Sequence, residues 1–307
     1  MAPIPSTTFW MGSDRHYPEE APARRVSVDA FLIDVAPVTN ADFRAFAQAT
    51  GYVTLAERPP DPALYPGADP KLLQPGSAVF VAPRRPTPPT DPFLWWCYAP
   101  GASWRRPLGP DSDLRGMDDH PVVHIAHEDA EAYALWAGKR LPTEAEWECA
   151  ARGGLDGAAY AWGEELEPGG QVLANYWRGR FPSQSLKPAG RFRTSPVGAF
   201  PPNAFGLYDM IGNVWEWTAD WYAQPAPPSD KPCCAPRNPR GASEEESRES
   251  SYPGAGFGRK VLKGGSHLCA DNYCQRYRPA ARYPQTIDTS TSHIGFRCAR
   301  TPEANDP

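Results

Sequence analysis

The segment KGGSHLCADNYCQRYRPAARYPQTIDTSTSHIGFR, residues 263–297, decides the fold and the chemistry expected of this chain. It holds two cysteines, Cys269 and Cys274, between a Gly-Gly turn and a run rich in arginine and tyrosine. Five residues turn a helix by about 500°, and an odd step puts strand residues on opposite faces, so neither element would bring the thiols together. Only a bent loop could, and the turn-forming residues Ala270, Asp271 and Asn272 permit one.

A thiol pair on a loop has three interpretations: a disulfide, a site for a soft metal ion, or two unrelated packing residues. Structural zinc is poorly supported, because such sites use a second pair of Cys or His ligands at similar spacing and the sequence has none. Two thiolates suit a soft ion of low coordination number, Cu(I) before any other. The spacing alone leaves these alternatives open.

Composition predicts one loop-rich domain over residues 1–307. The chain has 38 prolines and 26 glycines, which interrupt regular elements, so we expect much irregular backbone. It also has 41% hydrophobic and 12% aromatic residues, which is not the composition of a disordered chain. No repeat or linker divides the sequence, and buried aromatic side chains are expected to hold the loops.

The charge pattern excludes several classes of partner. The net charge is −5, with both signs interspersed, which gives no case for nucleic acid or an anionic membrane. No apolar run marks a signal peptide or a membrane span, so we expect a soluble protein of the cytoplasm. Seven cysteines are too few for a disulfide scaffold. We expect Cys97 and Cys149 to be buried inert thiols, and the adjacent pair Cys233-Cys234 to lie on an exposed loop.

Local patterns predict a small number of regular elements. Short strands are expected at 26–28, 31–33 and 120–125. The helices are expected from a cap at Thr39 or Asn40 to Gly51, from 128 to 137, and from a capping box of Thr143 and Glu146 to Gly153.

Two long irregular stretches complete the expected organisation. Residues 58–110 are proline-dense, and we expect them to be ordered by burial of Trp95, Trp96 and Trp104. Residues 224–258 are polar and weakly patterned, which favours a long mobile loop.

Two further constellations could bind metal. The steps of four and three between His120, His124 and His127 would line one helical face, but Pro121 disfavours a helix, so structural histidines are the favoured interpretation. Asp209 and Glu216 bracket a tight turn and could offer oxygen ligands to Ca²⁺. The alternative is that Glu216 pairs with an arginine.

Several motifs together resemble the formylglycine-generating enzymes, also called sulfatase-modifying factors. The resemblance runs from Met11-Gly12 to Arg297 and rests on these motifs: Gly264-Gly265-Ser266, Cys269, Tyr273-Cys274, Arg276-Tyr277-Arg278, Ala280-Ala281-Arg282, Gly295-Phe296-Arg297, RLPTEAEWE (140–148) and GNVWEWTADW (212–221). It implies a single compact α+β domain with little regular secondary structure, distantly like C-type lectin domains. It also implies a copper-dependent oxidase that uses O₂ and an external thiol reductant. The implied substrate is the cysteine of a Cys-x-Pro-x-Arg motif in an unfolded sulfatase, which becomes formylglycine.

The resemblance also implies site residues. Cys269 and Cys274 would hold Cu(I), while Ser266 and Tyr273 would line the pocket for oxygen and the substrate thiol. The expected substrate-binding residues are Asp61, Trp96, Trp104, Arg282 and His293. Asp61 would pair with the substrate arginine, or would merely form an Asx turn before Pro62. His293 stands where many relatives have asparagine, and Ala270 where some have histidine.

Calcium is implied as a structural ion. The first site would use the side chains of Asp209 and Glu216 with the carbonyls of Gly212 and Val214. A second would use Asn175 and Tyr176, although the acid expected near 190–192 is missing. The protein is expected to be a monomer, with no nucleic-acid or membrane partner.

Other function classes find less support in the sequence. A lectin-like binding scaffold without chemistry would have no use for two reactive loop cysteines. An iron-dependent sulfoxide synthase would need an H-x3-H-x-E motif, but Ala126 stands where the glutamate should be. Ser-His-Asp hydrolysis lacks a G-x-S-x-G elbow.

Overall fold

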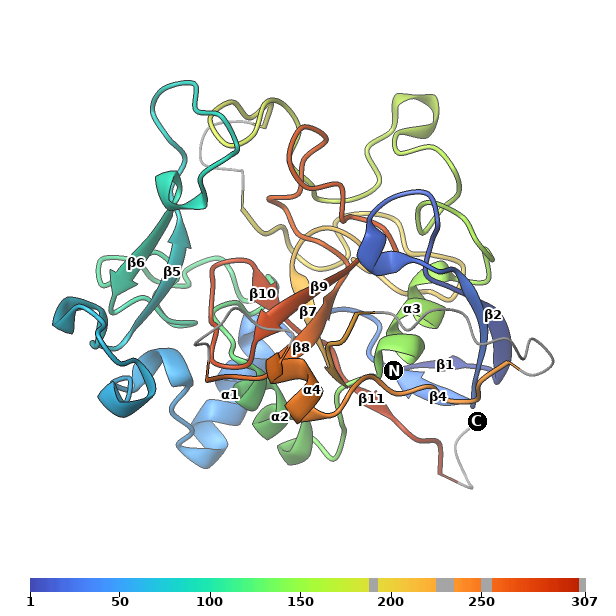
Figure 1. Cartoon of the computed structure of the whole chain (residues 1–307), viewed down its shortest axis with the longest axis horizontal. Helices are drawn as coiled ribbons and strands as arrows, with labels where there is room; N and C mark the ends of the chain where they lie inside the picture. The colour runs from blue at the N-terminus through green and yellow to red at the C-terminus, as the bar shows by residue number, and fades with distance from the viewer. Residues whose placement is uncertain (188–192, 225–234, 250–255, 304–307) are drawn as a thin grey trace.

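A four-stranded sheet in the order β10-β7-β8-β9 forms the centre of the fold (Figure 1). The computed structural model describes residues 1–187, 193–224, 235–249 and 256–303. The strands are β7 (Trp215–Trp221), β8 (Arg259–Lys263), β9 (Arg282–Thr286) and β10 (Ile294–Gly295). β8 pairs antiparallel with β7 and β9, whereas β10 pairs with β7 in parallel. The cysteine-bearing loop 264–281 therefore connects two paired strands, which fix both of its ends.

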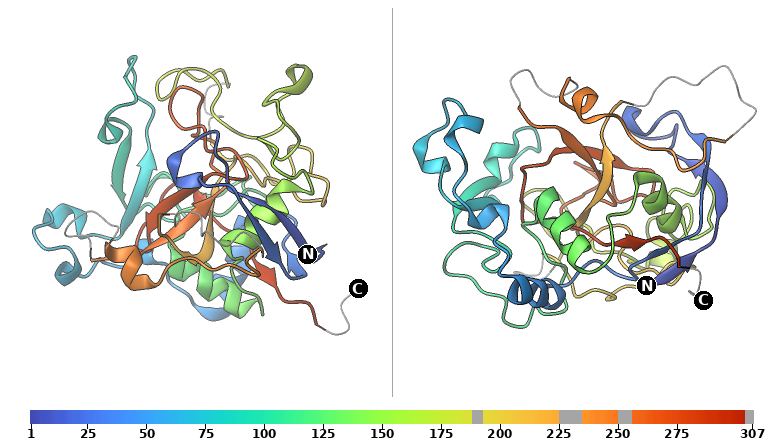
Figure 2. Two further views of the ribbon diagram at one scale, coloured as in Figure 1. Left: turned by 45° about the vertical axis from the view of Figure 1, so that its right-hand side comes forward. Right: turned by 90° about the horizontal axis from the view of Figure 1, so that it is seen from below.

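The two ends of the chain meet in a second, three-stranded sheet. Here β4 (Phe31–Ile33) lies between β1 (Ala2–Ile4) and β11 (Ala299–Arg300). A hairpin of β2 (Thr7–Met11) and β3 (Arg24–Val28) lies beside it. Both views in Figure 2 show the first strand, in dark blue, near the last described strand, in red. The predicted strands at 26–28 and 31–33 are confirmed.

Three helices form where they are predicted, to within one residue at each end. They are α1 (Asn40–Thr50), α2 (His127–Trp136) and α3 (Glu144–Arg152). Thr39 and Thr143 each form a capping box, and Gly51 and Gly153 end their helices in the left-handed conformation at φ 71° and 57°. The α3 prediction is thus confirmed to its boundaries, and α2 begins one residue earlier than expected.

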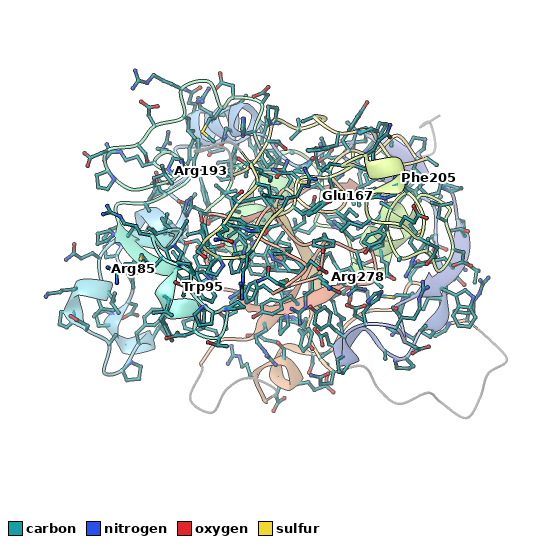
Figure 3. The ribbon with its side chains drawn as sticks, turned by 90° about the horizontal axis from the view of Figure 1, so that it is seen from above. Arg85, Trp95, Glu167, Arg193, Phe205 and Arg278 are labelled. Carbon is teal, nitrogen blue, oxygen red and sulfur yellow. The ribbon has the colours of Figure 1, made fainter. Side chains whose placement is uncertain are left out.

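The proline-dense stretch 58–110 is ordered, as predicted. It contains a hairpin of β5 (Gly76–Phe80) and β6 (Trp96–Pro100). Trp95 and Trp104 are buried and Trp96 is partly buried; Figure 3 shows Trp95 in the interior beside the hairpin and Arg85 at the edge. Proline is favoured at the first position of a short helix. Of the six 3₁₀ helices in the described residues, five begin with proline. These helices are η1 (Pro18–Glu20), η2 (Leu55–Glu57), η3 (Pro62–Leu64), η4 (Pro70–Leu72), η5 (Pro92–Leu94) and η6 (Pro168–Gly170).

Three apolar clusters make up the core. The largest packs α1 and α2 against β7, a second packs α3 against the terminal strands around Trp147, and the third gathers Phe80, Trp95, Trp177 and Phe181. The third cluster includes Leu268 and Ala270, so it supports the loop that carries the cysteines. The expected mixed α+β fold with little regular structure is confirmed.

Three local expectations need correction. Residues 120–125 do not form a strand, because His124 has φ 63° and only Pro121 makes an isolated bridge. The expected mobile loop 224–258 contains the helix α4 (Glu244–Glu249), and Cys233-Cys234 lie outside the described residues. Cys97 is exposed rather than buried, whereas Cys149 is buried as expected. Within the described ranges, no helix is long and apolar enough to cross a membrane.

Candidate active site

Cys269 and Cys274 lie on the loop between β8 and β9 with their Sγ atoms 3.1 Å apart. Both are reduced, and Cys269 is 2% and Cys274 9% exposed. The backbone turns tightly between them, because the amides of Cys269 and Cys274 donate to the carbonyls of Ser266 and Ala270 at 3.0 and 2.9 Å. The two sulfurs therefore meet on a bent loop, just beneath the surface.

The Gly-Gly turn before the cysteines is required by the backbone. Gly264 and Gly265 have φ of 90° and 71°, which other residues rarely adopt. A Cβ on Gly264 would lie 2.9 Å from the carbonyl oxygen of Met210, and one on Gly265 would lie 2.7 Å from that of Arg276. The turn therefore lets the loop fold back on itself and brings Arg276 next to the cysteines.

The surroundings of the two thiols are electrically different. The two sulfurs share one hydrogen bond, and Arg276 Nη1 lies 3.8 Å from Cys274 Sγ; both contacts lower the pKa of Cys274. Burial and the bond to Cys274 raise the pKa of Cys269 well above its ordinary value. The pair therefore favours a thiolate at Cys274 that accepts from a thiol at Cys269.

The N-terminal segment holds this loop in place. Glu19 accepts from Arg276 at 2.6 and 3.1 Å, and the Tyr17 ring lies 3.9 Å from the guanidinium carbon. The Tyr17 hydroxyl also accepts from the amide of Gln275 at 3.0 Å. Sequence reasoning missed these residues. Their only signal was a tyrosine and two glutamates in an N-terminal stretch, opposite an arginine-rich loop far along the chain.

Ser266 and Tyr273 lie with the thiols, as predicted. The Ser266 amide donates to Cys269 Sγ at 3.4 Å, and the side chain is buried. Tyr273 is 40% exposed and stacks on Phe181 at 4.4 Å. Burial raises the pKa of Tyr273 to about 12, so its hydroxyl stays protonated at neutral pH. The site thus combines two sulfurs, a hydroxyl donor and an aromatic wall.

The predicted substrate-binding residues are dispersed. Trp96 and His293 lie together, with ring centroids 4.8 Å apart, and burial lowers the pKa of His293, which keeps it neutral. Trp104 is 1% exposed, packs on Phe43 and donates to Glu57, so it belongs to the core. The Trp104 prediction is therefore wrong, while the roles of Trp96 and His293 stay predictions.

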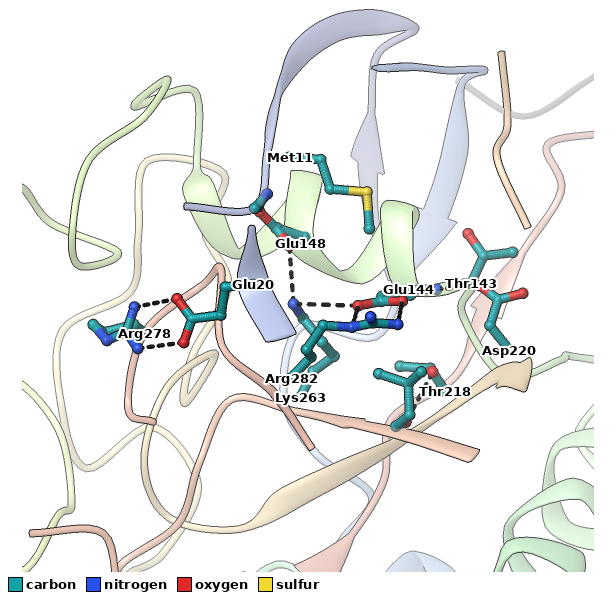
Figure 4. A network of polar contacts seen from close by, with 12 residues as sticks. Met11, Glu20, Thr143, Glu144, Glu148, Thr218, Asp220, Lys263, Arg278 and Arg282 are labelled. Carbon is teal, nitrogen blue, oxygen red and sulfur yellow. Dashed lines mark hydrogen bonds and ion pairs between the residues drawn. The ribbon is translucent and has the colours of Figure 1, made fainter. Parts of the chain in front are cut away.

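Arg282 also has a different role from the one predicted. Its guanidinium donates to both carboxylate oxygens of Glu144 at 2.7 and 2.9 Å, and Lys263 lies beside the same acid (Figure 4). The Arg282 side chain is 11% exposed. Because Glu144 and the carbonyl of Ala223 occupy its donors, Arg282 joins β9 to α3 and does not present a free cation to a substrate.

The first calcium site stays a prediction, and its two carboxylates have different partners. Glu216 accepts from Arg297 at 2.7 and 2.8 Å and from the Trp147 indole at 2.7 Å, so the alternative of an arginine pair is the one observed. Asp209 is 8% exposed and accepts only from the Gly198 amide and the Asn213 side chain. No ion pair is seen at Asp209 among the described residues. A cation there would offset a buried charge, so the carboxylate of Asp209 fits such an ion better than Glu216 does.

The second calcium prediction fits the structure less well. The Asn175 side-chain oxygen accepts from the ammonium of Lys187, and its amide donates to the carbonyl of Arg193 at 2.9 Å. The Tyr176 hydroxyl donates to Glu167. A dication beside the Lys187 ammonium would be repelled. Part of the expected ligand region, 188–192, lies outside the described residues.

The three histidines are structural, as favoured. His124 is fully buried between Ser77 Oγ at 2.7 Å and the carbonyl of Pro107 at 2.9 Å. Burial lowers its pKa to about 4, so it is neutral. His120 contacts Thr194, and His127 contacts the carbonyl of Thr218. Their different partners rule out a shared ion among them.

Asp61 caps η3 and lines a cavity of about 830 Å³. Its carboxylate accepts from the Ala63 amide at 2.9 Å, which is the predicted Asx turn. The cavity is lined by residues 55–73, β5, α2 and the segment after β9, and neither cysteine lines it. The structure thus places Asp61 away from the thiols, and its role toward a substrate stays a prediction.

The sulfur pair fits a soft metal ion. Among the described residues no three His, Cys, Asp or Glu side chains gather around one point, so a metal at the loop would have two protein ligands. Two buried sulfurs 3.1 Å apart form the donor set that a soft ion of low coordination number accepts. Cys269 and Cys274 would hold Cu(I) there.

Comparison with known proteins relates this site to a family. The model of the sulfatase-modifying factor enzyme 1-like domain matches residues 1–302. The formylglycine-generating enzyme of Mycobacterium tuberculosis (strain ATCC 25618 / H37Rv) is 53% identical over 302 residues, which cover 97% of each chain. The inactive C-alpha-formylglycine-generating enzyme 2 of Mus musculus is 38% identical and covers 97% of this chain and 85% of its own. The structure of PvdO from Pseudomonas aeruginosa has a TM-score of 0.62 at 25% identity, covering 98% of this chain and 93% of that one.

The match spans nearly the whole chain and includes the cysteine loop, α3 and β7. The sequence motifs, the observed fold and the relatives therefore agree. This chain belongs to the family of the formylglycine-generating enzymes, with one sulfatase-modifying factor enzyme 1-like domain.

Proposed function

We propose that this protein oxidises the cysteine of a Cys-x-Pro-x-Arg segment in an unfolded sulfatase to formylglycine, and so activates the sulfatase. Membership of the family supports sulfatase activation by conversion of a cysteine to formylglycine. Because the family also includes a protein named inactive, membership alone does not decide activity. The observation that carries the proposal is the pair of reduced sulfurs 3.1 Å apart on a nearly buried loop.

The overall reaction requires an electron acceptor and a reductant. The substrate CH₂–SH group, O₂ and two hydrogen atoms from two external thiols give CHO, H₂S and water, and the two thiols leave as a disulfide. When bound by Cys269 and Cys274, Cu(I) would supply the one-electron chemistry with O₂ that side chains cannot perform.

The residues of this chain prepare the site for that chemistry. Arg276 places positive charge beside the Cys274 sulfur, and Glu19 orients the guanidinium. The protonated Tyr273 hydroxyl can donate a hydrogen bond to an incoming substrate group. Burial of both sulfurs limits their contact with water, which protects them from unproductive oxidation.

The cavity near Asp61 is placed to receive the arginine of the substrate motif. Arg276 lies 3.8 Å from the Cys274 sulfur and 5.2 Å from the ring of Tyr283, at the start of β9. The segment that follows β9, Ile287 to Ser290, lines the cavity. The five residues of β9 and the five residues of Cys-x-Pro-x-Arg each span four extended steps, roughly 13 Å. The two lengths agree, which supports an arginine bound among the acids of the cavity.

The function is tested by incubating the protein with Cu(I), a thiol reductant, oxygen and the peptide Leu-Cys-Thr-Pro-Ser-Arg, and then measuring the peptide mass. The expected product is the aldehyde, formed only when all components are present. Peptide binding without any aldehyde would instead indicate a scaffold without chemistry.

We further propose that the protein works as a monomer in the cytoplasm. The cytoplasm is a reducing compartment, and exposed Cys97 is unpaired in the described chain.

Asp61→Ala should raise the KM for the six-residue peptide about tenfold and leave kcat nearly unchanged, because a charge pair remote from the sulfurs acts on binding. Steady-state kinetics with the wild type and Asp61→Asn as comparison measure this. An unchanged KM would leave Asp61 as a turn residue only.

Calcium should stabilise the protein through Asp209. At a calcium concentration 100 times the Kd, the expected gain in unfolding free energy is about 2.7 kcal/mol, seen as a rise in Tm. The variant Asp209→Asn should lose this response, while Asp113→Asn, an exposed acid, should keep it. A Tm that does not respond to calcium or to a chelator would reject the structural calcium ion.

A further inference from the structure

We propose that the cavity lined by Asp61, called here the distal cavity, docks a second segment of the polypeptide substrate, apolar and carrying lysine or arginine. This inference rests on the proposed function, because it takes the ligand to be an unfolded polypeptide. It goes beyond recognition of the motif arginine, since it assigns the rest of the cavity.

The size and walls of the distal cavity suit more than one side chain. Its volume is about 830 Å³, within the range that holds a drug-sized ligand. Leu64 of η3 and Leu72 of η4 line it and are 54% and 48% exposed. Tyr98, Phe257 and Ile287 add further apolar surface. Exposed leucines that gather around one cavity are a feature of a surface that another chain covers.

The charges around the distal cavity favour a cationic ligand. The lining acids are Asp61, Glu128, Glu131, Glu244 and Asp288, and the lining cations are Arg58 and Lys260. Three of the acids already have partners, since Glu128 pairs with Arg58, Glu131 with His127 and Glu244 with Arg248. Asp61 and Asp288, for which no ion pair is seen in the described chain, are left for a ligand. Neither cation is available, because Arg58 pairs with Glu128 while the Lys260 ammonium donates to the carbonyl of Ala219 at 2.8 Å. The Lys260 ammonium also lies 3.8 Å from the centre of the Trp221 ring. The excess of negative charge would attract lysine or arginine and repel an acidic segment.

One acid in the cavity lacks a full set of partners. Asp288 Oδ2 accepts from the Tyr65 hydroxyl at 2.7 Å. Asp288 Oδ1 is buried and has no hydrogen-bond partner within the described chain. A buried carboxylate oxygen without a donor is costly, and an ammonium or guanidinium group in the cavity would satisfy it.

The position of the distal cavity also fits a polypeptide substrate. Two strands link it to the thiol site: β9 as described above, and β5, whose first residues line the cavity while Phe80 at its end packs on Phe181. Phe181 in turn stacks on Tyr273 beside the cysteines. In Figure 1 the segment 55–75 and the chain after β9 lie on the same side of the central sheet. A chain that enters the thiol site can therefore continue along this side.

The proposal is tested with three fluorescent peptides in which serine replaces the reactive cysteine. The first peptide is the six-residue motif alone. The second is the motif extended by ten residues that include two leucines and two lysines. The third has an extension of the same length in which serine replaces each leucine and glutamate replaces each lysine. Each extension is made on the N-terminal and on the C-terminal side. On one of the two sides of the motif, the leucine–lysine extension should lower the Kd about tenfold relative to the motif alone. The acidic extension on that side should not lower the Kd.

The variant Leu64→Ser/Leu72→Ser should reduce this gain to less than about threefold, where the gain is the ratio of the Kd of the motif alone to that of the extended peptide, both measured in the same variant. Leu135→Ser is the matched control, because Leu135 is 80% exposed and does not line the distal cavity. Equal Kd values for all peptides, or a full gain in the double variant, would overturn the proposal. A gain without aldehyde formation from any cysteine peptide would uphold the docking site and reject the proposed oxidation.

Discussion

Cys269→Ser and Cys274→Ser should each lower the rate of aldehyde formation by about 10³-fold or more, because each removes one of two sulfurs that act as a unit. The sulfurs are 3.1 Å apart and no third protein ligand is at hand in the described chain, so one cannot substitute for the other. A hydroxyl is a poor ligand for a soft ion. The rate is measured by peptide mass spectrometry under saturating copper and reductant.

Two control measurements distinguish loss of the metal site from loss of the folded structure. Cys97→Ser alters an exposed thiol outside the site and should keep the wild-type rate. Copper binding, measured by competition with a chromogenic Cu(I) chelator, should fall by one equivalent in both site variants and should be unchanged in Cys97→Ser. Turnover at the wild-type rate in either Cys269→Ser or Cys274→Ser would contradict the assigned roles.

Glu148→Gln should be among the most destabilising single substitutions in this chain, at about 3–5 kcal/mol. Glu148 is 1% exposed and accepts from Lys263 at 2.9 Å (Figure 4). It also accepts from Arg152 and from the Gly12 amide, each at 2.7 Å. The substitution leaves buried Arg152 without its carboxylate, and leaves Lys263 with Glu144 at 3.9 Å, which is already paired with Arg282. The midpoint of urea unfolding measures the loss. Glu164→Gln, which breaks an exposed pair with Arg15, should leave that midpoint unchanged.

The same carboxylate should give stability a distinct pH dependence. Burial alone would raise the pKa of Glu148, but Lys263 and Arg152 lower it to about 2. Because the folded pKa is below the ordinary value of about 4.5, the stabilisation is complete above pH 4.5 and is lost as the pH falls toward 2. The difference in unfolding free energy between wild type and Glu148→Gln should therefore shrink over that interval. If the difference in unfolding free energy stays constant with pH, the pKa of Glu148 does not change on folding.

Features encoded by neighbouring residues could be predicted from sequence. The boundaries of α3 follow from Thr143, Glu146 and Gly153, which all lie within one short segment. The bend between the cysteines follows from three turn-forming residues and a Gly-Gly pair. In each case the decisive hydrogen bonds form within a few residues, so no knowledge of the tertiary fold was needed.

Features decided by distant partners could not be predicted in this way. Arg282 resembled a substrate contact until its partner Glu144, 138 residues earlier, was seen beside it. Glu216 pairs with Arg297, which lies 81 residues later in the chain. One local signal lies inside the stretch predicted to be a mobile loop: Ser243 and Glu246 exchange hydrogen bonds as a capping box at the start of α4.

The tether between Tyr17 and Gln275, 258 residues apart, bears on how the protein is made. The ribosome adds Gln275 only 258 residues after Tyr17, and β11 must still reach β4 after that. The N-terminal segment therefore remains without its final partners while all of these residues are translated. A nascent chain stalled before residue 260 should have neither thiol site nor closed terminal sheet.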